Sequence, residues 1–412
     1  MAQKIALIHF AYFPNIGGVE ILLKEHALML TKLGYDVTVI TGFGKSSPKD
    51  GVKVIEIPNL QSIHSFDPKL ETEISHGNFN QDYFTLVDYL KKIMHQYFSQ
   101  YDSLVVHNMM TFPHNLAFIE AFSQYTLSTN QSILIYTHDH KYIYNAQALD
   151  LNSAATSDRE KKLLTTPLKN ATYIAISKTF RIPLAKLLAL PEEEIHVVPN
   201  AININRFLNI DDEMDNIFQK FGIYKKFPII LSPVNILERK NLVYALEVIA
   251  NLKKQYHEIY YIISGTPSHH HESEKYFALL KEKIKSLELT ENVLFLYTKI
   301  NHVLSPQEMH SLYILSDAIL YLSKSENFGL PIIESALTKT PIFVSNLEVF
   351  HEVGGNYLTY INPDTTSPSK TAEIINAYFQ TYKYELLNHH VRSHYELTTV
   401  LEKYFIPLLK KN

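Results

Sequence analysis

Two glutamates stand on either side of an FGLP turn in the stretch SENFGLPIIES, with Glu326 before the turn and Glu334 after it. Carboxylate oxygens accept hydrogen bonds from hydroxyl groups. Proline suits the first position of a helix, so a helix is expected to begin at Pro331, and the amides of a helix N-terminus attract phosphate. The stretch therefore predicts contacts to the hydroxyl and phosphate groups of one elongated ligand. The alternative is that Glu334 is only a carboxylate stabilised by the dipole at the start of the helix, and that Glu326 is a solvated loop charge.

A pair of cations, Arg239 and Lys240, follows an apolar run that ends near Ser232 and precedes a helical pattern that begins near Asn241. Cations at the carboxyl end of a sheet strand can clamp a diphosphate, and the planar guanidinium of arginine suits bidentate contact with phosphate oxygens. A solvated pair of loop charges is the alternative.

Two adjacent glycines, Gly17 and Gly18, follow the first apolar run and open a helical pattern. Glycine lets the backbone come close to a ligand. A plain turn before the helix is the alternative. The surrounding FPNIGGVEILL lacks the G-x-G-x-x-G spacing of dinucleotide-binding folds, which counts heavily against a nicotinamide oxidoreductase.

Two histidines lie at the ends of apolar runs in the first half of the chain. His107-Asn108 closes the run SLVVH, and His138-Asp139 follows the run SILIY. Ligands of parallel sheets bind beyond the carboxyl ends of the strands, so both pairs are candidates for ligand contact. The alternative for each is a loop histidine that is hydrogen-bonded to a neighbour.

The consecutive residues His269-His270-His271-Glu272 do not predict a metal site. Three histidines in a row cannot all face one ion, because histidine ligands on a helix are spaced three or four residues apart. We interpret the run as a loop and predict no metal ligands. Cysteine is absent, which excludes disulfides, zinc-cysteine sites, iron–sulfur clusters and a thiol nucleophile.

Composition excludes two further classes of partner. The chain of 412 residues has a formal net charge of -4, and it has no aromatic-basic repeats, so nucleic acid is not expected as a partner. No run of about 18 apolar residues is present, so we expect at most peripheral contact with a membrane. The first residues are too short an apolar run for a signal peptide, and a soluble cytoplasmic protein is the expectation.

Short apolar runs alternate with amphipathic ones along the chain. Helices are expected at 19–34, 113–126, 241–254, 273–287, 306–316, 331–339 and about 385–410, where apolar residues recur at helical spacing. Strands are expected at 4–10, 35–41, 52–58, 103–107, 132–138, 172–177 and 194–199, and again at 227–233, 259–265, 292–297, 318–323, 341–346 and 357–362.

This alternation favours parallel sheets covered by helices on both faces. The strands are too many for one sheet, so we predict two Rossmann-like domains. The boundary is expected in the polar stretch 200–216, which gives domains 1–205 and 206–390. A final helix at 391–412 could pack on either domain, including back on the first.

The stretch SENFGLPIIES, followed by PIFVSNLEVFHEVGG, resembles the donor-binding signature of glycosyltransferase family 4. The resemblance covers nearly the whole chain and is strongest at 231–241 and 316–355. It implies the GT-B fold, an α/β fold in which the parallel sheets of two Rossmann-like domains face a central cleft.

The resemblance also implies roles for residues of the second domain. Glu326 and its turn would contact the sugar of a nucleotide-sugar, and Glu334 would contact the ribose. Ser264 and Gly265 would approach the phosphates. The donor-binding residues implied in this domain are Asn235, Ser264, Gly265, Asn327, Phe328, Gly329, Leu330 and Glu334.

One position departs from the family pattern. Family members usually carry an arginine five residues before the lysine that matches Lys240, where this chain has Asn235. Arg239 is the candidate to replace that arginine. If it does not, activity is expected to be weak or absent.

In the first domain, the resemblance implies that Gly17 and Gly18 contact donor phosphate or acceptor. His138 would lie near the donor sugar. The acceptor candidates are His107, Asn108 and Asp139.

The predicted function is transfer of a hexosyl unit from a UDP-, GDP- or ADP-sugar to a hydroxyl group of a carbohydrate or glycolipid. The resemblance implies retention of configuration without metal, and no cofactor beside the substrate. Lys240, Arg239, His138 and Glu326 are the catalytic candidates. A non-catalytic sugar-nucleotide-binding subunit stays open because of Asn235, as does another GT-B enzyme such as a sugar-nucleotide epimerase or a phosphorylase. Neither the donor, the acceptor nor the oligomeric state is indicated.

Overall fold

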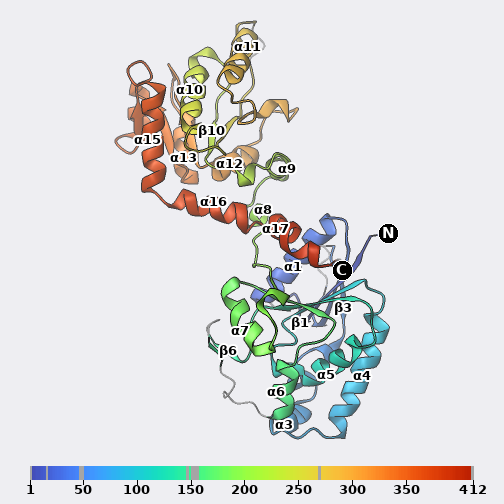
Figure 1. Ribbon diagram of the computed structural model, residues 1–412. Coiled ribbons are helices and arrows are strands. Elements are labelled where there is room, and N and C mark those ends of the chain that lie inside the picture. Colours follow the sequence, from blue (N-terminus) through green and yellow to red (C-terminus); the bar gives the residue numbers. More distant parts are fainter. Residues whose placement is uncertain are drawn as a thin grey trace. The chain divides into compact units, whose positions relative to one another are not determined.

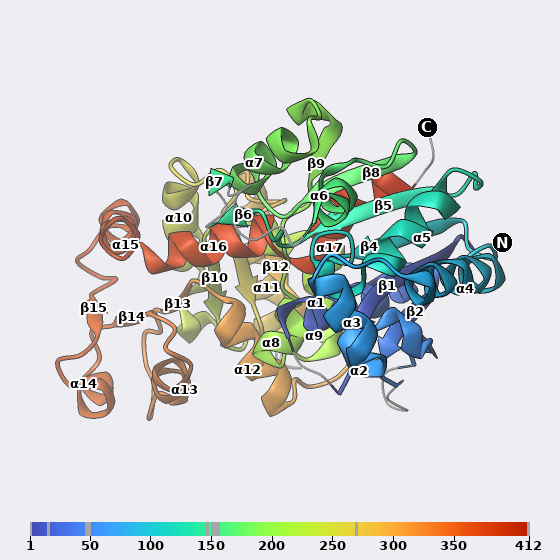
Figure 2. The ribbon, with the colours of Figure 1, turned by 90° about the horizontal axis from the view of Figure 1, so that it is seen from below.

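The computed structural model describes residues 2–14, 17–45, 51–144, 148–149, 157–267 and 271–409. The chain divides into two compact units (Figures 1 and 2). Unit 1 consists of Met1–Ile202 with Leu397–Asn412, and unit 2 consists of Asn203–Glu396.

Unit 1 is built on a seven-stranded parallel sheet with the order β3-β2-β1-β4-β5-β8-β9. Each strand is a run of apolar residues that the sequence predicts. The strands are β1 Lys4–Ala11, β2 Asp36–Phe43, β3 Lys53–Glu56, β4 Ser103–His107, β5 Ser132–Thr137, β8 Ala171–Ala175 and β9 Ile195–Val197. A separate hairpin joins β6 Ile143–Tyr144 and β7 Ala148–Leu149.

Alternate side chains of the unit 1 sheet enter two cores, as the pleat of a strand requires. Ala6 and Ile8 of β1 enter one core, and Ile5 and Leu7 enter the other. Figure 1 shows α1 and α17 on one side of this sheet and α3, α4, α5 and α6 on the other. The helices are α1 Gly18–Lys32, α2 Ile63–Phe66, α3 Pro68–Ser75, α4 Gln81–Tyr97, α5 Leu116–Thr126, α6 Asp158–Thr165, α7 Lys178–Leu188, α17 Leu397–Val400 and α18 Ile406–Leu409.

Helix α1 ends at the glycine that the sequence predicts for its C-terminus. Gly34 has a φ of +93°, a conformation that glycine adopts without strain. The amide of Tyr35 donates to the carbonyl of Leu30 at 3.1 Å, and the amide of Gly34 donates to that of Thr31 at 3.0 Å. These two bonds form a Schellman motif, which satisfies the last carbonyls of the helix.

The C-terminal segment is not one helix from 385 to 410. Helix α16, Tyr384–His394, belongs to unit 2, whereas α17, a π-helical turn at Leu401–Phe405 and α18 belong to unit 1. The break lies at Tyr395 and Glu396, after which the amide of Leu397 donates to the carbonyl of Ile202. Five apolar side chains of this segment are buried in the unit 1 core: Leu397, Val400, Leu401, Phe405 and Leu409.

Unit 2 is built on a six-stranded parallel sheet with the order β12-β11-β10-β13-β14-β15, whose last four strands follow one another in Figure 2. The strands are β10 Ile229–Ser232, β11 Tyr260–Ile263, β12 Val293–Phe295, β13 Ala318–Tyr321, β14 Ile342–Ser345 and β15 Thr359–Ile361. The helices are α8 Ile204–Leu208, α9 Asp212–Lys220, α10 Leu242–Lys253, α11 His271–Ser286, α12 Pro306–Leu315, α13 Leu330–Thr338, α14 Glu348–Gly354, α15 Pro368–Thr381 and α16.

The two parallel sheets, with helices following most strands, confirm the predicted α/β fold class. None of the helices in the described part of the chain combines the length and the apolar character needed to cross a bilayer.

Candidate active site

A pocket of about 480 Å³ lies at the carboxyl ends of the unit 2 strands, and we call it the unit 2 pocket. Its walls come from the loops after β10, β11, β12 and β13, the edge at which parallel sheets bind ligands. Of the residues predicted for this unit, the pocket gathers all except Glu334: Asn235, Arg239, Lys240, Ser264, Gly265, Glu326, Asn327, Phe328, Gly329 and Leu330. Thr266, Ile300, His302, Met309 and Tyr321 also line it, and the sequence did not single them out.

One carboxylate, that of Glu326, forms ion pairs with both cations of the unit 2 pocket. Lys240 forms an ion pair with Oε1 of Glu326, and Nη1 of Arg239 lies 3.1 Å from Oε2. The hydroxyl of Ser323 also donates to Oε1 at 2.7 Å. Burial alone would raise the pKa of Glu326, but the hydrogen bonds from Lys240 and Ser323 hold that pKa below its ordinary value. Glu326 is therefore ionised and pairs with both cations, so its one negative charge is shared between Lys240 and Arg239.

The turn before α13 exposes amide groups at the pocket wall. Gly329 has a φ of +115°, and a Cβ there would lie 3.0 Å from the ring of Phe350. The helix begins at Leu330, so Pro331 is its second residue. Our prediction that the helix begins at Pro331 is therefore wrong by one residue. Pro331 has no N–H, and the amide of Ile332 donates to the carbonyl of Gly329 at 2.9 Å. Within the described chain, the amides of Gly329 and Leu330 therefore remain available to an anion.

Gly265 is required by the neighbouring loop. A Cβ at this position would lie 2.4 Å from the carbonyl oxygen of Val234 and 2.6 Å from the nitrogen of Asn235. The amide of Ile236 donates to the carbonyl of Thr266 at 3.0 Å, so the loops after β10 and β11 are joined. Asn235 is exposed, and its side chain has no hydrogen bond within the described residues. Glycine at position 265 is thus needed for the close packing of these two loops.

Glu334 lies outside the residues that line the unit 2 pocket. It is partly buried on α13, and its Oε2 accepts a hydrogen bond of 2.6 Å from the hydroxyl of Tyr313 on α12. The sequence showed no reason to select Tyr313.

In unit 1, His107 and His138 form a hydrogen-bonded pair. Nδ1 of His107 lies 3.0 Å from Nε2 of His138, and the ring of His138 is also bonded to the side chain of Asn200. Burial lowers the pKa of His138 to about 3 and that of His107 well below its ordinary value, so both rings are neutral. His107 has no exposed surface, so in this structure it holds His138 and does not reach a bound molecule.

Asn108 shapes the loop that carries His138. Its φ is +56°, and its Oδ1 accepts hydrogen bonds from the amides of His138 at 3.1 Å and Asp139 at 3.0 Å. Asp139 is exposed, and its Oδ1 accepts from the amide of His140 at 2.7 Å. The side chain of Asn108 is therefore engaged by the protein, although Asp139 is open to solvent.

The glycine pair before α1 is covered on one side by a glutamate. A Cβ at Gly17 would lie 2.4 Å from Oε2 of Glu20, whereas a Cβ at Gly18 would meet nothing within 4 Å. The hydrogen bond from His9 lowers the pKa of Glu20, and Nδ1 of His9 donates to the carbonyl of His107 at 2.7 Å. Glu20 and His9 were not selected from the sequence, because His9 lies within the first strand and Glu20 within the first helix.

One group in the described chain, Glu213, His302 and Glu308, has the spacing for a metal ion, with ligand atoms all within 4.8 Å of one another. Nε2 of His302 lies 2.7 Å from Oε1 of Glu308. The other oxygen of Glu308 accepts from the amide of Ser305 at 2.6 Å and so caps α12. These contacts account for the group without an ion. The run at 269–272 lies outside the residues whose side chains the structure describes.

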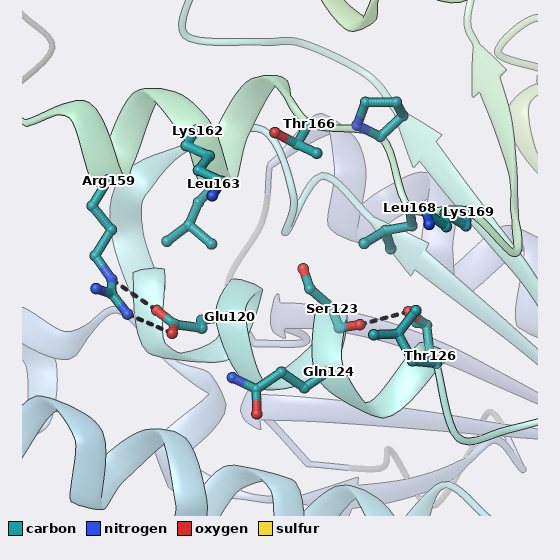
Figure 3. A pocket seen from close by; sticks show the side chains of 12 residues that line it. Glu120, Ser123, Gln124, Thr126, Arg159, Lys162, Leu163, Thr166, Leu168 and Lys169 are labelled. Atoms are coloured by element: carbon teal, nitrogen blue, oxygen red, sulfur yellow. Dashed lines mark hydrogen bonds and ion pairs between the residues drawn. The ribbon is translucent and has the colours of Figure 1, made fainter.

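A second pocket, of about 460 Å³, lies in unit 1 between α5 and α6 (Figure 3). It contains none of the predicted site residues. Nε of Arg159 donates to Oε2 of Glu120 at 3.0 Å, so the acidic group of this pocket is already neutralised. Lys162 and Lys169, which also line it, are exposed to solvent.

The chain matches two family models in succession. Residues 16–206 match the model described as Glycosyltransferase Family 4, and residues 213–389 match Glycosyl transferases group 1. Together they leave out only residues 1–15, 207–212 and 390–412. The chain belongs to glycosyltransferase family 4. The fold and the family predicted from the sequence are thus confirmed, and the protein is a glycosyltransferase.

Two curated relatives of this family 4 glycosyltransferase have names that refer to mannosyl groups. O-antigen chain mannosyltransferase RfbU of Salmonella typhimurium is 31% identical over 205 residues, which cover 49% of this chain and 50% of that protein. The match therefore spans about half the length of that relative. Mannosylglucosylglycerate synthase of Petrotoga mobilis is 24% identical over 376 residues, which cover 84% of this chain and 83% of that protein.

Among solved structures, a glycosyltransferase from Rickettsia africae has a TM-score of 0.40 with 20% identity, over 100% of both chains. Anabaena HepE, solved in complex with UDP, has a TM-score of 0.36 with 16% identity, over 99% of this chain and 97% of that one.

Proposed function

We propose that this family 4 glycosyltransferase moves a hexosyl unit from a nucleotide-sugar to a hydroxyl group of a carbohydrate or glycolipid acceptor. The names of two relatives, a mannosyltransferase and a mannosylglucosylglycerate synthase, favour mannose as the sugar. Retention of configuration and independence of metal belong to the same proposal, which extends what the family resemblance implies.

One observation carries the proposal: the unit 2 pocket brings two cations, a carboxylate and free amides together. Arg239, Lys240 and Glu326 line it, together with the amides of Gly329 and Leu330. A nucleotide-sugar presents hydroxyl groups next to a diphosphate. The carboxylate suits the hydroxyls, and the cations and amides suit the phosphate oxygens.

The same groups can lower the barrier to transfer. The bond between the anomeric carbon and the diphosphate oxygen breaks, and negative charge grows on that oxygen. Lys240, Arg239 and the amides before α13 would stabilise this charge. Removing one donor of this kind typically costs ~10²–10³ in rate. The acceptor oxygen forms the new bond to the anomeric carbon, and its proton passes to the departing diphosphate oxygen.

Glu326 must release the cations for this to occur. In the structure it pairs with Lys240 and Arg239. The incoming diphosphate takes over the cations, and the freed carboxylate accepts from a sugar hydroxyl. Binding of the donor therefore exchanges the ion pairs to Glu326 for ion pairs to the diphosphate, and the Glu326 carboxylate gains a hydrogen bond from the sugar.

A non-catalytic nucleotide-sugar-binding subunit is the second candidate, and Asn235 favours it. The residue lines the pocket with a neutral, exposed side chain where family members usually carry an arginine. An assay for glycoside and free nucleotide separates this role from an enzyme, because a binding subunit would form neither product.

Replacing Lys240 tests the proposal. Purified protein with GDP-mannose, UDP-glucose and ADP-glucose, each with a panel of glycosyl acceptors, should release nucleoside diphosphate. Lys240→Ala should lower the rate by roughly 10²-fold or more while thermal unfolding stays within a few degrees. Lys226→Ala is the matched control, since it also removes an ion-paired lysine, from Glu258 outside the pocket. An unchanged rate in Lys240→Ala would refute the assignment of this pocket.

A further inference from the structure

Tyr313 is a buried tyrosine whose hydroxyl is hydrogen-bonded to the carboxylate of Glu334. Its side chain is 1% exposed, and its hydroxyl donates to Oε2 of Glu334 at 2.6 Å. The second oxygen of Glu334, Oε1, has no partner among the described residues. A carboxylate with one oxygen held and the other open is suited to accept from a ligand hydroxyl.

The two side chains stand one turn behind the wall of the unit 2 pocket. Met309 on α12 and Leu330 on α13 line the pocket, and Tyr313 and Glu334 follow each of them by four residues. Residues four apart on a helix lie on the same face. Tyr313 and Glu334 therefore lie on the same helix faces as the pocket residues Met309 and Leu330, one turn farther along each helix.

The backbone around Tyr313 is also fixed. The hydroxyl of Thr340, just after α13, donates to the carbonyl of Tyr313 at 2.9 Å. Burial, followed by the bond to Glu334, raises the pKa of the Tyr313 hydroxyl above its ordinary value. The phenol therefore stays protonated and remains a donor over the whole physiological pH range.

We propose that Tyr313 is the positioning residue for Glu334 and holds its carboxylate so that Oε1 accepts from a ribose hydroxyl of the bound nucleotide. The inference rests on the proposed function and on the ribose contact of Glu334 that the family resemblance implies. Glutamate has three rotatable bonds, and the phenol removes that freedom before the ligand arrives. The carboxylate of Glu334 is therefore oriented for the ribose before the nucleotide binds.

Ribose recognition is measured by comparing each nucleotide with its 2′,3′-dideoxy form. Calorimetry of UDP, GDP and ADP, with the three dideoxy counterparts, gives the ratio of the two dissociation constants for the base that binds best. The full-length chain should prefer the ribonucleotide. Tyr313→Phe should reduce that preference by about threefold to tenfold, as expected for loss of one hydrogen bond to a charged group.

Tyr224→Phe is the matched control. Tyr224 is a buried tyrosine of unit 2 whose hydroxyl donates to Asp215 at 2.8 Å, and neither residue lines the pocket. It should lose stability as Tyr313→Phe does and keep the full preference for ribose. Glu334→Ala should abolish the preference.

The outcomes separate the two levels of the proposal. If Glu334→Ala abolishes the preference and Tyr313→Phe leaves it unchanged, the positioning role is wrong and the ribose contact stands. If Glu334→Ala also leaves it unchanged, the ribose assignment is wrong. If none of the three nucleotides binds, the proposed function fails, and the inference fails with it.

Discussion

Glu326 lines the unit 2 pocket, and its partners there could not be read from the sequence. Its type and its place before a turn suggested contact with hydroxyl groups. The structure instead shows it bound to Lys240 and Arg239, which come from a loop far away in the sequence. The pairing is a product of the sheet order, which places β13 beside β10.

Replacing Glu326 by glutamine should separate binding from turnover. Glu326→Gln frees Lys240 and Arg239, so a nucleoside diphosphate should bind about threefold to tenfold more tightly, as expected when a charge pair of about 1 kcal/mol no longer competes. Turnover should fall by roughly tenfold or more, since the sugar loses its carboxylate contact. Calorimetry and initial rates measure the two effects.

Glu238→Gln is the control for that change, because Glu238 is an exposed glutamate of the same loop as Arg239 and does not line the pocket. Both quantities should stay as in the unmodified protein. Weaker binding in Glu326→Gln would show that the carboxylate does not compete for the cations.

At the scale of elements, apolar pattern was sufficient for the sheets and insufficient for the polar helices. The runs predicted as strands lie in the two sheets, because buried parallel strands are nearly continuous in apolar residues. Helix α9, Asp212–Lys220, begins in the polar stretch 200–216 and was missed. Its N-cap Asp211 accepts from two amides, and only Met214, Ile217 and Phe218 are apolar and buried. One turn and a half of apolar residues is too short a pattern to detect.

Site residues divide in the same way. The pocket residues at strand ends could be predicted, since topology alone brings those ends together. The structural roles of Asn108 and Gly265 each depend on contacts with a neighbouring loop. Asn108 accepts hydrogen bonds from one such loop, and Gly265 packs closely against another. Tyr313 depends on the packing of α12 against α13. No spacing in the sequence reports such contacts.

The helical segment 397–409 is predicted to contribute as much to unit 1 as a core strand does. Phe405 has no exposed surface and lies among the core residues over β1 and β5. Phe405→Ala should reduce the free energy of unfolding by about 3–5 kcal/mol, because it leaves a cavity. Leu408→Ala, in a residue only partly buried, should cost clearly less. Denaturant titration measures both, and equal small losses would contradict the docking of this segment.

At the scale of the molecule, unit 1 contains a group of neutral buried histidines that makes its stability depend on pH. His26 is fully buried, neither ring nitrogen has a hydrogen-bond partner in the described structure, and burial lowers its pKa to about 4. His107 and His138 add to the same effect. A histidine that must stay neutral in the folded state binds a proton more readily when unfolded, so stability falls with pH below the ordinary pKa of 6.5.

His26→Leu should remove part of this dependence. Between pH 7.5 and pH 5 the unmodified protein should lose about 2 kcal/mol through His26 alone. The loss begins as pH falls below the unfolded value and is complete near the folded one. His26→Leu should lose correspondingly less over the same interval, as measured by denaturant titration at both pH values. Identical losses in the two proteins would show that His26 titrates normally.

Unit 2 is inserted between two segments that together make up unit 1. During synthesis, residues 203–396 are made before residues 397–409, so the face of the first sheet that α17 and α18 cover must wait while an entire second unit is translated. For that interval Val39, Val105 and Leu134 lack their last apolar neighbours. A nascent chain stalled after Glu396 should therefore be a target for chaperones that bind exposed apolar surface.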